Sequence, residues 1–520
     1  IKIDSLVNTT GFPKALANFT FRGIKNDATL PFLNQNIDLK DILDDDLFEN
    51  LFALYRIGPD SRSIKPLERI LYSRSKEEII SYTLNNFRKL KYFPNDFNLA
   101  EELISNESWN IRTEAATAIC FYQFKSIDEI THYLSLLNDD NPNVSRSLGM
   151  SLKNIRYPIS IKDELQILIE TNLYNKKLNE NTRGELFISY CSLFPNELED
   201  KIDDYEDIIN KRFIYRILQD NIIDSEFNFE YLTDHIGESS EVELIDLLPA
   251  LLAIQNRFLN EDEDAAIVLK VLNGELASSI SLICYGLKMP FIYHYQEMLQ
   301  EIIIDQIFRF RNNEYFTDTI LSLADLASRI NLNFYTTVLD LISQSRVNSL
   351  QRFAAEKLNE PVPPKTLPDK FNRILHNSFR YSKAIIKTYS GDFTIQLKPE
   401  IAPISVGNFV TFVEEGFYSN IPFHRVVPDF VIQSGDSTGT GWNGPGYEIV
   451  SEFSPSPFVK GSVGMASTGK DTEGAQWFVM HSVFPHLDGR YSNFGYVIEG
   501  MDVVNIIDED DRIIQIELIE

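Results

Sequence analysis

The sequence predicts a multidomain protein, in which an all-α N-terminal region precedes a C-terminal β-barrel with two helices at its ends. The chain has 520 residues, more than one hydrophobic core usually serves. Fifteen of its 23 glycines fall in residues 381–520, where tight turns and positive φ angles favour short strands. The preceding 380 residues hold the other eight and are rich in Leu, Ile, Asn, Asp and Glu, so we expect helices there.

A weak repeat runs through the N-terminal region. The frame IRTEAATAI at residues 111–119 is followed by a similar frame at 144–152, just after Asn141-Pro142, and residues 350–358 fit the first frame again. Small residues in mid-helix let a second helix pack closely, and a period of about 30 to 45 residues is typical of stacked helix pairs. These frames resemble HEAT-type repeats. We therefore expect a HEAT-like α-solenoid over residues 1–360, with a non-repeating helical bundle as the alternative.

A further helix is expected near residue 320. Asp318 is a candidate for its cap. The helix carries one apolar stripe at helical spacing, formed by Ile320, Leu323, Ala324 and Ala327, which is typical of core packing.

A proline-rich stretch separates the two regions. Residues 359–368 read NEPVPPKTLP, with four prolines in eight residues. Proline lacks a backbone donor and favours extended backbone, so neither a helix nor a central strand is expected here. The sequence therefore predicts a semi-rigid linker over residues 361–380.

The C-terminal domain, residues 381–520, has a readable order of elements. Two strands at 384–389 and 393–397 flank a Ser-Gly-Asp turn and predict a hairpin. A helix follows from Pro403 and ends at Gly416, and a second short helix carries Val503, Val504 and Ile507. A final strand alternates over residues 514–518. Many short strands with two helices favour a barrel.

Composition narrows the classes of partner. The chain has 48 Lys and Arg against 76 Asp and Glu, a net charge of −28, so nucleic acid is not an expected partner. The C-terminal domain alone has eight basic and 19 acidic residues, a net charge of −11. No apolar run reaches the roughly 20 residues that span a bilayer, so we expect no transmembrane segment in this chain. Cys120, Cys191 and Cys284 are too far apart for a disulfide framework or a zinc site and are expected to be buried thiols.

The residues with chemical interest lie between 423 and 491. Residues 423–436 read FHRVVPDFVIQSGD, and on extended backbone Val431 and Gln433 share one face. Residues 474–480 read GAQWFVM and place Gln476 beside Phe478 in the same way. A cation and amides among aromatic side chains are costly unless solvent, a partner or a ligand satisfies them. The pattern therefore predicts a binding surface.

This segment resembles cyclophilin-type peptidyl-prolyl cis-trans isomerases over the whole C-terminal domain. Four ordered blocks carry the resemblance: residues 423–436, 461–466, 474–478 and 487–495. The resemblance implies an eight-stranded closed β-barrel capped by two helices.

The resemblance also implies the site residues. Arg425 and Gln433 would be catalytic, with Arg425 acting on the bond and Gln433 orienting it. The substrate-binding residues would be Phe430, Val431, Ala466, Ser467, Gln476, Phe478, His486, Leu487 and Tyr491. His486 and Tyr491 stand where tryptophan and histidine are common, and Val431 stands where methionine is common. These departures put inhibitor binding of the cyclosporin type and fine substrate preference in doubt.

Catalysis of rotation about an X-Pro bond requires few functional groups. Rotation about an X-Pro bond is opposed by a barrier of about 20 kcal/mol from amide resonance. An apolar pocket that holds the ring and a cationic donor that favours the twisted amide lower that barrier without nucleophile, metal or cofactor. Arginine is permanently charged and presents a fixed fork of donors. No cofactor and no metal are therefore expected.

Other candidate sites fail on their spacing. The histidines at 424, 481 and 486 match no zinc motif. The acidic run 508–511 lacks the pattern of a calcium loop and is interpreted as a solvated turn. The glycine-rich residues 439–446 are not followed by Lys-Ser/Thr, so they are interpreted as a loop near the pocket rather than a phosphate loop.

Two functions follow as hypotheses. The first is a folding-assisting isomerase that accepts proline-containing polypeptides, with a solenoid that binds clients or an unknown protein partner. The alternative is a non-catalytic scaffold whose C-terminal domain only reads proline peptides; the intact Arg425, Phe430, Gln433 and Phe478 favour the first. The chain begins with Ile1, as a trimmed or processed chain would. Similar two-domain proteins suggest a bacterial cell envelope or periplasm, with cytoplasm as the alternative.

Overall fold

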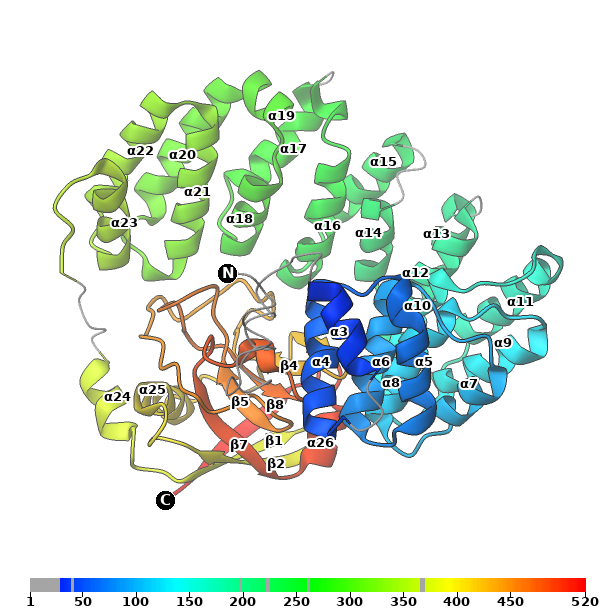
Figure 1. Ribbon diagram of the computed structural model, residues 1–520. Coiled ribbons are helices and arrows are strands. Elements are labelled where there is room, and N and C mark those ends of the chain that lie inside the picture. Colours follow the sequence, from blue (N-terminus) through cyan, green and yellow to red (C-terminus); the bar gives the residue numbers. More distant parts are fainter. Residues whose placement is uncertain (1–28, 39–41, 196–197, 221–224, 260–261, 365–369) are drawn as a thin grey trace. The chain divides into compact units, whose positions relative to one another are not determined.

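A computed structural model describes residues 29–38, 42–195, 198–220, 225–259, 262–364 and 370–520 (Figure 1). The chain divides into two compact units, Ile1–Phe194 and Pro195–Glu520. The helical region expected over residues 1–360 is thus shared between the two units, and the boundaries expected at 360 and 380 stay a prediction. Part of the expected linker, residues 365–369, lies outside the described residues.

The first unit is helical throughout its described part. Its helices are α3 (Thr29–Ile37), α4 (Asp44–Ile57), η1 (Ser61–Ser63), α5 (Ile64–Ser73), α6 (Glu77–Leu90), α7 (Phe97–Ile104), α8 (Trp109–Ala118), η2 (Ile119–Phe121), α9 (Ile127–Leu134), η3 (Ser135–Asn138), α10 (Pro142–Ser151), η4 (Leu152–Asn154), η5 (Ile159–Ile161), α11 (Lys162–Leu173) and α12 (Glu180–Leu193). Alternate helices pack in series: α4 on α6, α6 on α8, α8 on α10 and α10 on α12. Buried Ala115 and Ala116 on α8 keep these contacts close. Asn141 caps α10 and Pro142 lies in its first turn.

The second unit begins with helices that pack in the same serial way. They are α13 (Leu198–Tyr205), α14 (Lys211–Asp220), α15 (Ser225–Ile236), α16 (Glu241–Ala253), η7 (Arg257–Leu259), α17 (Asp262–Leu272), α18 (Ala277–Gly286), α19 (Met289–His294), α20 (Gln296–Phe310), η8 (Glu314–Phe316), α21 (Thr317–Ile330), α22 (Leu332–Ser343) and α23 (Asn348–Leu358). Helix α16 packs on α14 and α18, and α21 on α18 and α22. The predicted stripe on α21 is fully buried. Asp318 was expected as its cap, but the helix begins one residue earlier and Asp318 lies in the first turn.

Eight strands follow in one sheet. They are β1 (Lys383–Thr388), β2 (Gly391–Leu397), β3 (Arg425–Val427), β4 (Val431–Ser434), β5 (Ser462–Met465), β6 (Trp477–Met480), β7 (Asn493–Glu499) and β8 (Ile513–Ile519), accompanied by α25 (Pro403–Glu414), η9 (Pro485–Leu487) and α26 (Met501–Ile506). The spatial order is β3-β4-β6-β5-β7-β2-β1-β8, with antiparallel neighbours. The predicted hairpin, both helices and the final strand are confirmed.

The closed barrel expected from the resemblance is not confirmed. Strands β3 and β8 end the series and share no ladder among the described residues. A single bridge, Pro422 with Arg512, joins the segments that lead into them. Backbone hydrogen bonds flank this bridge, from the Ile513 N–H to the Ile421 carbonyl at 2.9 Å and from the Phe423 N–H to the Asp511 carbonyl at 2.7 Å, so Pro422 occupies a position at which no N–H is needed.

The sheet surrounds an aromatic core. Trp477 on β6 is fully buried, and the rings of Phe409, Tyr418 and Phe423 approach it edge-on with centroids 5.8 to 6.3 Å away. Edge-to-face packing suits the opposite charges of ring edges and faces. This core fixes β6, the central strand of the site described below.

Helix α24 (Phe371–Asn377) occupies part of the expected linker. It packs along α25, with the Asn377 amide donating to the Thr411 hydroxyl at 3.2 Å. Arg373 forms ion pairs with Glu414 and Glu415 at 3.0 Å. The second half of the stretch expected as a linker, residues 361–380, thus includes a helix docked on α25, because these polar and charged groups face partners there.

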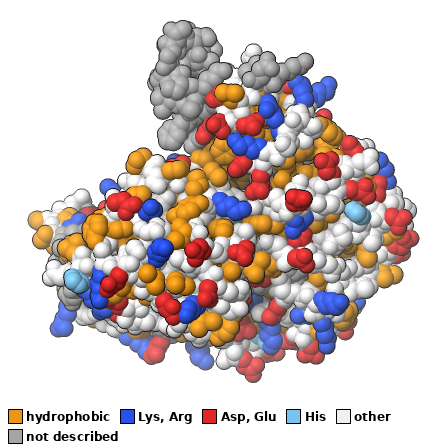
Figure 2. All heavy atoms as spheres, turned by 90° about the horizontal axis from the view of Figure 1, so that it is seen from below, with side chains coloured by type: hydrophobic (Ala, Val, Ile, Leu, Met, Phe, Trp, Pro, Cys, Tyr) orange, Lys and Arg blue, Asp and Glu red, His pale blue; other side chains and the backbone are white. Residues whose placement is uncertain are grey.

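The sequence predicted no nucleic-acid-binding surface, no transmembrane segment and buried cysteines, and the described residues can be compared with each expectation. On the face drawn in Figure 2, acidic, basic and apolar side chains are interspersed, and the described residues there gather no basic patch. Within the described part of the chain no helix has both the length and the apolarity that crossing a bilayer requires. All three cysteines are buried and unpaired, as predicted.

Gly407 on α25 tests the docking of α24. A Cβ at this position would lie 2.0 Å from the carbonyl oxygen of Ile374, which is backbone and cannot move alone. We expect Gly407→Ala to push α24 away and to lower the free energy of unfolding by about 1–3 kcal/mol. Urea unfolding followed by tryptophan fluorescence measures this. Gly469→Ala is the control, since nothing lies within 4 Å of its Cβ; equal losses in both variants would contradict the docking.

Candidate functional site

A chain of polar side chains crosses strands β3, β4 and β6. Arg425 lies opposite Gln433 in the β3–β4 register, and its Nη1 donates to Oε1 of Gln433 at 3.3 Å. Nε2 of Gln433 donates to Oε1 of Gln476 at 2.9 Å. In each glutamine the amide oxygen accepts on the side of the guanidinium, and the amide nitrogen donates on the side away from it. The orientation of Arg425 therefore depends on both glutamines.

This series of hydrogen-bonded side chains ends at the glycine-rich loop of residues 439–446, which was interpreted from sequence as a loop near the pocket. Nε2 of Gln476 donates to the carbonyl oxygens of Gly441 and Asn443, at 3.0 Å each. Asp436 shapes this loop, because its carboxylate accepts from the backbone N–H groups of Thr438, Gly441 and Asn443 at 2.8, 2.6 and 3.3 Å. A carboxylate with several backbone donors is a strong local constraint. The loop thereby presents two carbonyls at fixed positions.

An apolar cluster adjoins Arg425. Its buried members are Val431, Phe458, Phe478, Met480 and Leu487, and its partly buried members are Phe430, Ala466, Phe484 and Tyr491. The rings meet in defined pairs: Phe478 stacks on Phe458 with centroids 5.6 Å apart, and the edge of Tyr491 meets Phe478 at 5.7 Å. The cluster offers apolar contact area of the kind that holds a small ring.

Gly464 on β5 makes room for the two phenylalanine rings. A Cβ there would lie 2.4 Å from Cζ of Phe478 and 2.7 Å from Cε1 of Phe458. The pairing of Gly464 with Phe478 across β5 and β6 places the ring over bare backbone. No larger residue fits at position 464 without moving the floor of the cluster.

Two opposing effects act on the pKa of Arg425. Burial lowers the pKa of its guanidinium, while the charge of Glu509 raises it. Arginine nevertheless stays charged at neutral pH. Its Cζ lies 5.9 Å from the centroid of the Phe430 ring, a cation–π distance. The site thus joins one permanent cation, still accessible to solvent, to an apolar surface.

Two nearby histidines, His424 and His481, are held in the neutral form by burial. Burial lowers the pKa of His481 to about 4, although its Nε2 contacts the carbonyl oxygen of Val504 at 3.1 Å. Burial also lowers the pKa of His424. His486 stacks on the Phe430 ring with centroids 6.0 Å apart and extends the apolar cluster.

The structure brings almost all the sequence-predicted site residues together. Six of them belong to the apolar cluster: Phe430, Val431, Ala466, Phe478, Leu487 and Tyr491. Arg425, Gln433 and Gln476 form the polar chain, and His486 touches the cluster. Ser467 lies just beyond β5, half-buried, where the Ala466 N–H already bonds to the Gln476 carbonyl at 2.9 Å.

The sequence analysis missed several members of the site. Phe458, Met480 and Phe484 belong to the cluster, and Gly441 and Asn443 accept from Gln476. Met480 could have been found, because it shares a face with Phe478 on β6. Phe458 and the two carbonyls lie on irregular backbone, where no periodicity marks them.

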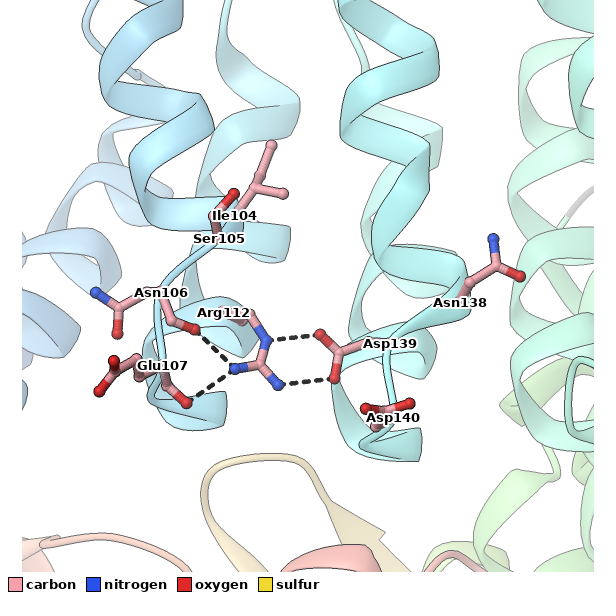
Figure 3. A pocket seen from close by; sticks show the side chains of 8 residues that line it. All are labelled: Ile104, Ser105, Asn106, Glu107, Arg112, Asn138, Asp139 and Asp140. Atoms are coloured by element: carbon pink, nitrogen blue, oxygen red, sulfur yellow. Dashed lines mark hydrogen bonds and ion pairs between the residues drawn. The ribbon is translucent and has the colours of Figure 1, made fainter.

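A pocket of about 410 Å³ lies in the first unit, away from the residues described above, beside the turn after α7 (Figure 3). Arg112 spans it: Nε and Nη2 donate to the carboxylate of Asp139 at 2.6 and 2.9 Å, and Nη1 donates to the carbonyls of Asn106 and Glu107. The Arg112 guanidinium is thus held by hydrogen bonds to other parts of the first unit. Its bonds join the turn after α7 to the turn before α10, so Arg112 holds successive helix pairs together.

Comparison with known proteins identifies the C-terminal part. A family model described as cyclophilin type peptidyl-prolyl cis-trans isomerase/CLD matches residues 383–515. A peptidyl-prolyl cis-trans isomerase of Synechococcus elongatus is 39% identical over 140 residues, which cover 26% of this chain and 97% of the relative. Peptidyl-prolyl cis-trans isomerase B of Bacillus subtilis is 46% identical over 109 residues, covering 21% and 76%. A crystal structure of a Cryptosporidium parvum cyclophilin is 29% identical and covers 27% of this chain and 98% of its own, with a TM-score of 0.26.

Buried His481 predicts how stability depends on pH. Its pKa is about 4 in the folded chain and 6.5 ordinarily, so the unfolded state binds the proton more readily. Stability is complete above pH 6.5 and falls as pH decreases toward 4, by about 3 kcal/mol for this group. Urea unfolding at pH 7 and pH 4.5 should show a smaller loss for His481→Gln than for the wild type. Equal losses in both proteins would contradict the assignment.

Proposed function

The chain belongs to the family of cyclophilin-type peptidyl-prolyl cis-trans isomerases, and we propose that this isomerase acts on proline-containing segments of protein clients during folding. The observation that carries the site assignment is the contact between two features. The polar chain from Arg425 through Gln433 to Gln476 runs beside the apolar cluster around Phe478. Arg425 also lies over the Phe430 ring, which belongs to that cluster.

The geometry suits rotation about an X-Pro bond. The apolar cluster would receive the proline ring, and Arg425 would donate to the amide as it twists out of plane. In the planar amide the nitrogen lone pair is delocalised into the carbonyl, and in the twisted amide it is not. A fixed cation that interacts better with the twisted form lowers the barrier by differential binding. Gln433 holds the guanidinium, so the donor is already oriented when substrate arrives.

Charge suggests which clients are preferred. The C-terminal domain has a net charge of −11, and Arg425 is one of its three arginines. An acidic surface attracts basic chains over about 10 Å at ordinary ionic strength. We therefore propose that basic segments near a proline are favoured substrates.

The helical region is proposed to be a HEAT-like solenoid that binds clients or a protein partner. Its serial packing, α4 through α12 in the first unit and α14 through α23 in the second, supports this proposal. In such arrays each helix pair buries its apolar face against the next, which leaves long surfaces for binding. A pull-down with the full chain, compared with a variant lacking exposed apolar residues of α11 such as Ile167, tests it.

Two finer points remain proposals. The Pro422–Arg512 bridge, together with bonds between the Ile513 N–H and the Ile421 carbonyl at 2.9 Å, supports closure of the sheet into a barrel. A location in a bacterial cell envelope, with cytoplasm as the alternative, is the expectation from sequence. Fractionation of cells that express the tagged protein from its natural gene tests the location.

Arg425→Ala tests the catalytic assignment. With a short X-Pro peptide and the full chain, we expect kcat/KM to fall about 100-fold to 1,000-fold, as when one transition-state donor is removed. Arg425→Lys should recover only part of the activity, because a point charge lacks the planar fork. Lys398→Ala is the control, since Lys398 pairs with Glu400 at the surface. Peptide binding without acceleration by the wild type would instead indicate a scaffold that reads proline peptides.

A further inference from the structure

The loop that carries Gly441 and Asn443 packs against helices of the second unit. A Cβ at Gly446 would lie 2.7 Å from the Cβ of Glu314 on η8, and one at Gly439 would lie 3.6 Å from Cγ2 of Val242 on α16. Both ends of the loop therefore lie close to helical neighbours, and at Gly446 no room is left for a side chain.

Aromatic side chains add to this contact. The ring of Trp442, in the middle of the loop, has its centroid 6.3 Å from that of Tyr285 on α18. Burial, together with the charges of Glu241 and Asp436, raises the pKa of Tyr315 to about 12. Asp436 is the carboxylate that shapes the loop, so the field at Tyr315 reports its closeness to the loop.

A second contact joins α14 to the acidic turn before β8. Nε of Arg212 lies 2.7 Å from the carboxylate of Asp246 on α16, while its other nitrogens lie 3.6 Å from Glu509 and 3.5 Å from Asp510. Burial opposes the charge of Arg212, but these three carboxylates outweigh it and raise its pKa. The acidic run, interpreted from sequence as a solvated turn, is thus engaged by a cation.

Both contacts lead to Arg425. The loop carbonyls of Gly441 and Asn443 hold Gln476, which holds Gln433, which accepts from Arg425. Glu509 in turn acts electrostatically on Arg425. The helical part is therefore connected to the catalytic guanidinium by a short series of direct contacts.

We propose that helices α14, α16, α18 and η8 position Arg425 by holding the loop at residues 438–446 and the acidic turn at 508–511. The helical part is then a component of the isomerase site as well as a binding region. Activity depends on it even for a peptide too short to reach the helices. Tyr285 and Arg212 are positioning residues in this arrangement, which rests on the proposed isomerase site.

Tyr285→Ala in the full chain is the first test. Tyr285 is 54% exposed, so its truncation leaves α18 folded. With a short X-Pro peptide we expect kcat to fall about threefold to tenfold with little change in KM, because a contact that orients a transition-state donor is loosened. Tyr285→Phe should restore kcat, since the ring is kept. Tyr293→Ala on α19 is the matched control: it removes a tyrosine that is 76% exposed and should change neither parameter.

Arg212→Gln is the second test, with Arg309→Gln as its control. Arg309 pairs with Glu275 at an exposed position, where the two side chains are 44% and 73% accessible. We expect Arg212→Gln to lower kcat and to weaken its dependence on salt, while Arg309→Gln behaves as the wild type.

Amide hydrogen exchange separates this inference from the isomerase assignment. Exchange in residues 438–446 should become faster in Tyr285→Ala and stay unchanged in Tyr293→Ala, whether or not the protein is active. Unchanged exchange and unchanged kcat in Tyr285→Ala and Arg212→Gln, in an active wild type, would overturn the inference. An inactive wild type with faster loop exchange in Tyr285→Ala would overturn the isomerase site and leave the contact standing.

Discussion

The charge of Arg425 beside an apolar cluster is the constraint on which the rest of the site depends. A guanidinium on such a surface loses hydration, and the lowered pKa of Arg425 reflects that cost. Among the described residues its side chain donates to Oε1 of Gln433. Nε2 of Gln433 donates to Gln476, and Nε2 of Gln476 donates to two backbone carbonyls, so each amide is oriented by a partner at both ends.

These polar partners keep their hydrogen-bonding geometry only if they are attached to a rigid part of the chain. Strand β6 serves this purpose: Gln476 precedes it, Trp477 anchors it in the aromatic core, and Phe478 faces the cluster. Alternation along a single strand thus fixes a hydrogen-bonding residue, a core residue and a pocket residue in three successive positions. A shift of register by one residue would exchange the core and pocket residues, so stability and the site select the same register.

Sequence alone predicts those parts in which local pattern and chemistry coincide. The hairpin at 384–397, the helix from Pro403 and the alternation around Phe478 carry their own signals, whereas six residues of the apolar cluster were predicted through the family resemblance. Helix α24 was missed, because proline and charge next to it resemble a linker and its docking depends on Glu414, distant in sequence. The two loop carbonyls were missed for a similar reason, since backbone acceptors have no residue type by which they can be recognised.

The same distinction applies to the acidic run at 508–511, whose ion pairs with Arg212 have no signal in the sequence. Viewed alone, four consecutive carboxylates repel one another and favour solvent. In the folded unit Arg212 lies among Asp246, Glu509 and Asp510, and the Asp510 N–H donates to the Phe423 carbonyl at 3.0 Å. The turn is thus tied both to the helices and to the backbone two residues before Arg425. The negative charge near Arg425 is therefore part of the architecture: the charge of Glu509 favours the charged guanidinium, and among the described residues no ion pair occupies the donors of Arg425.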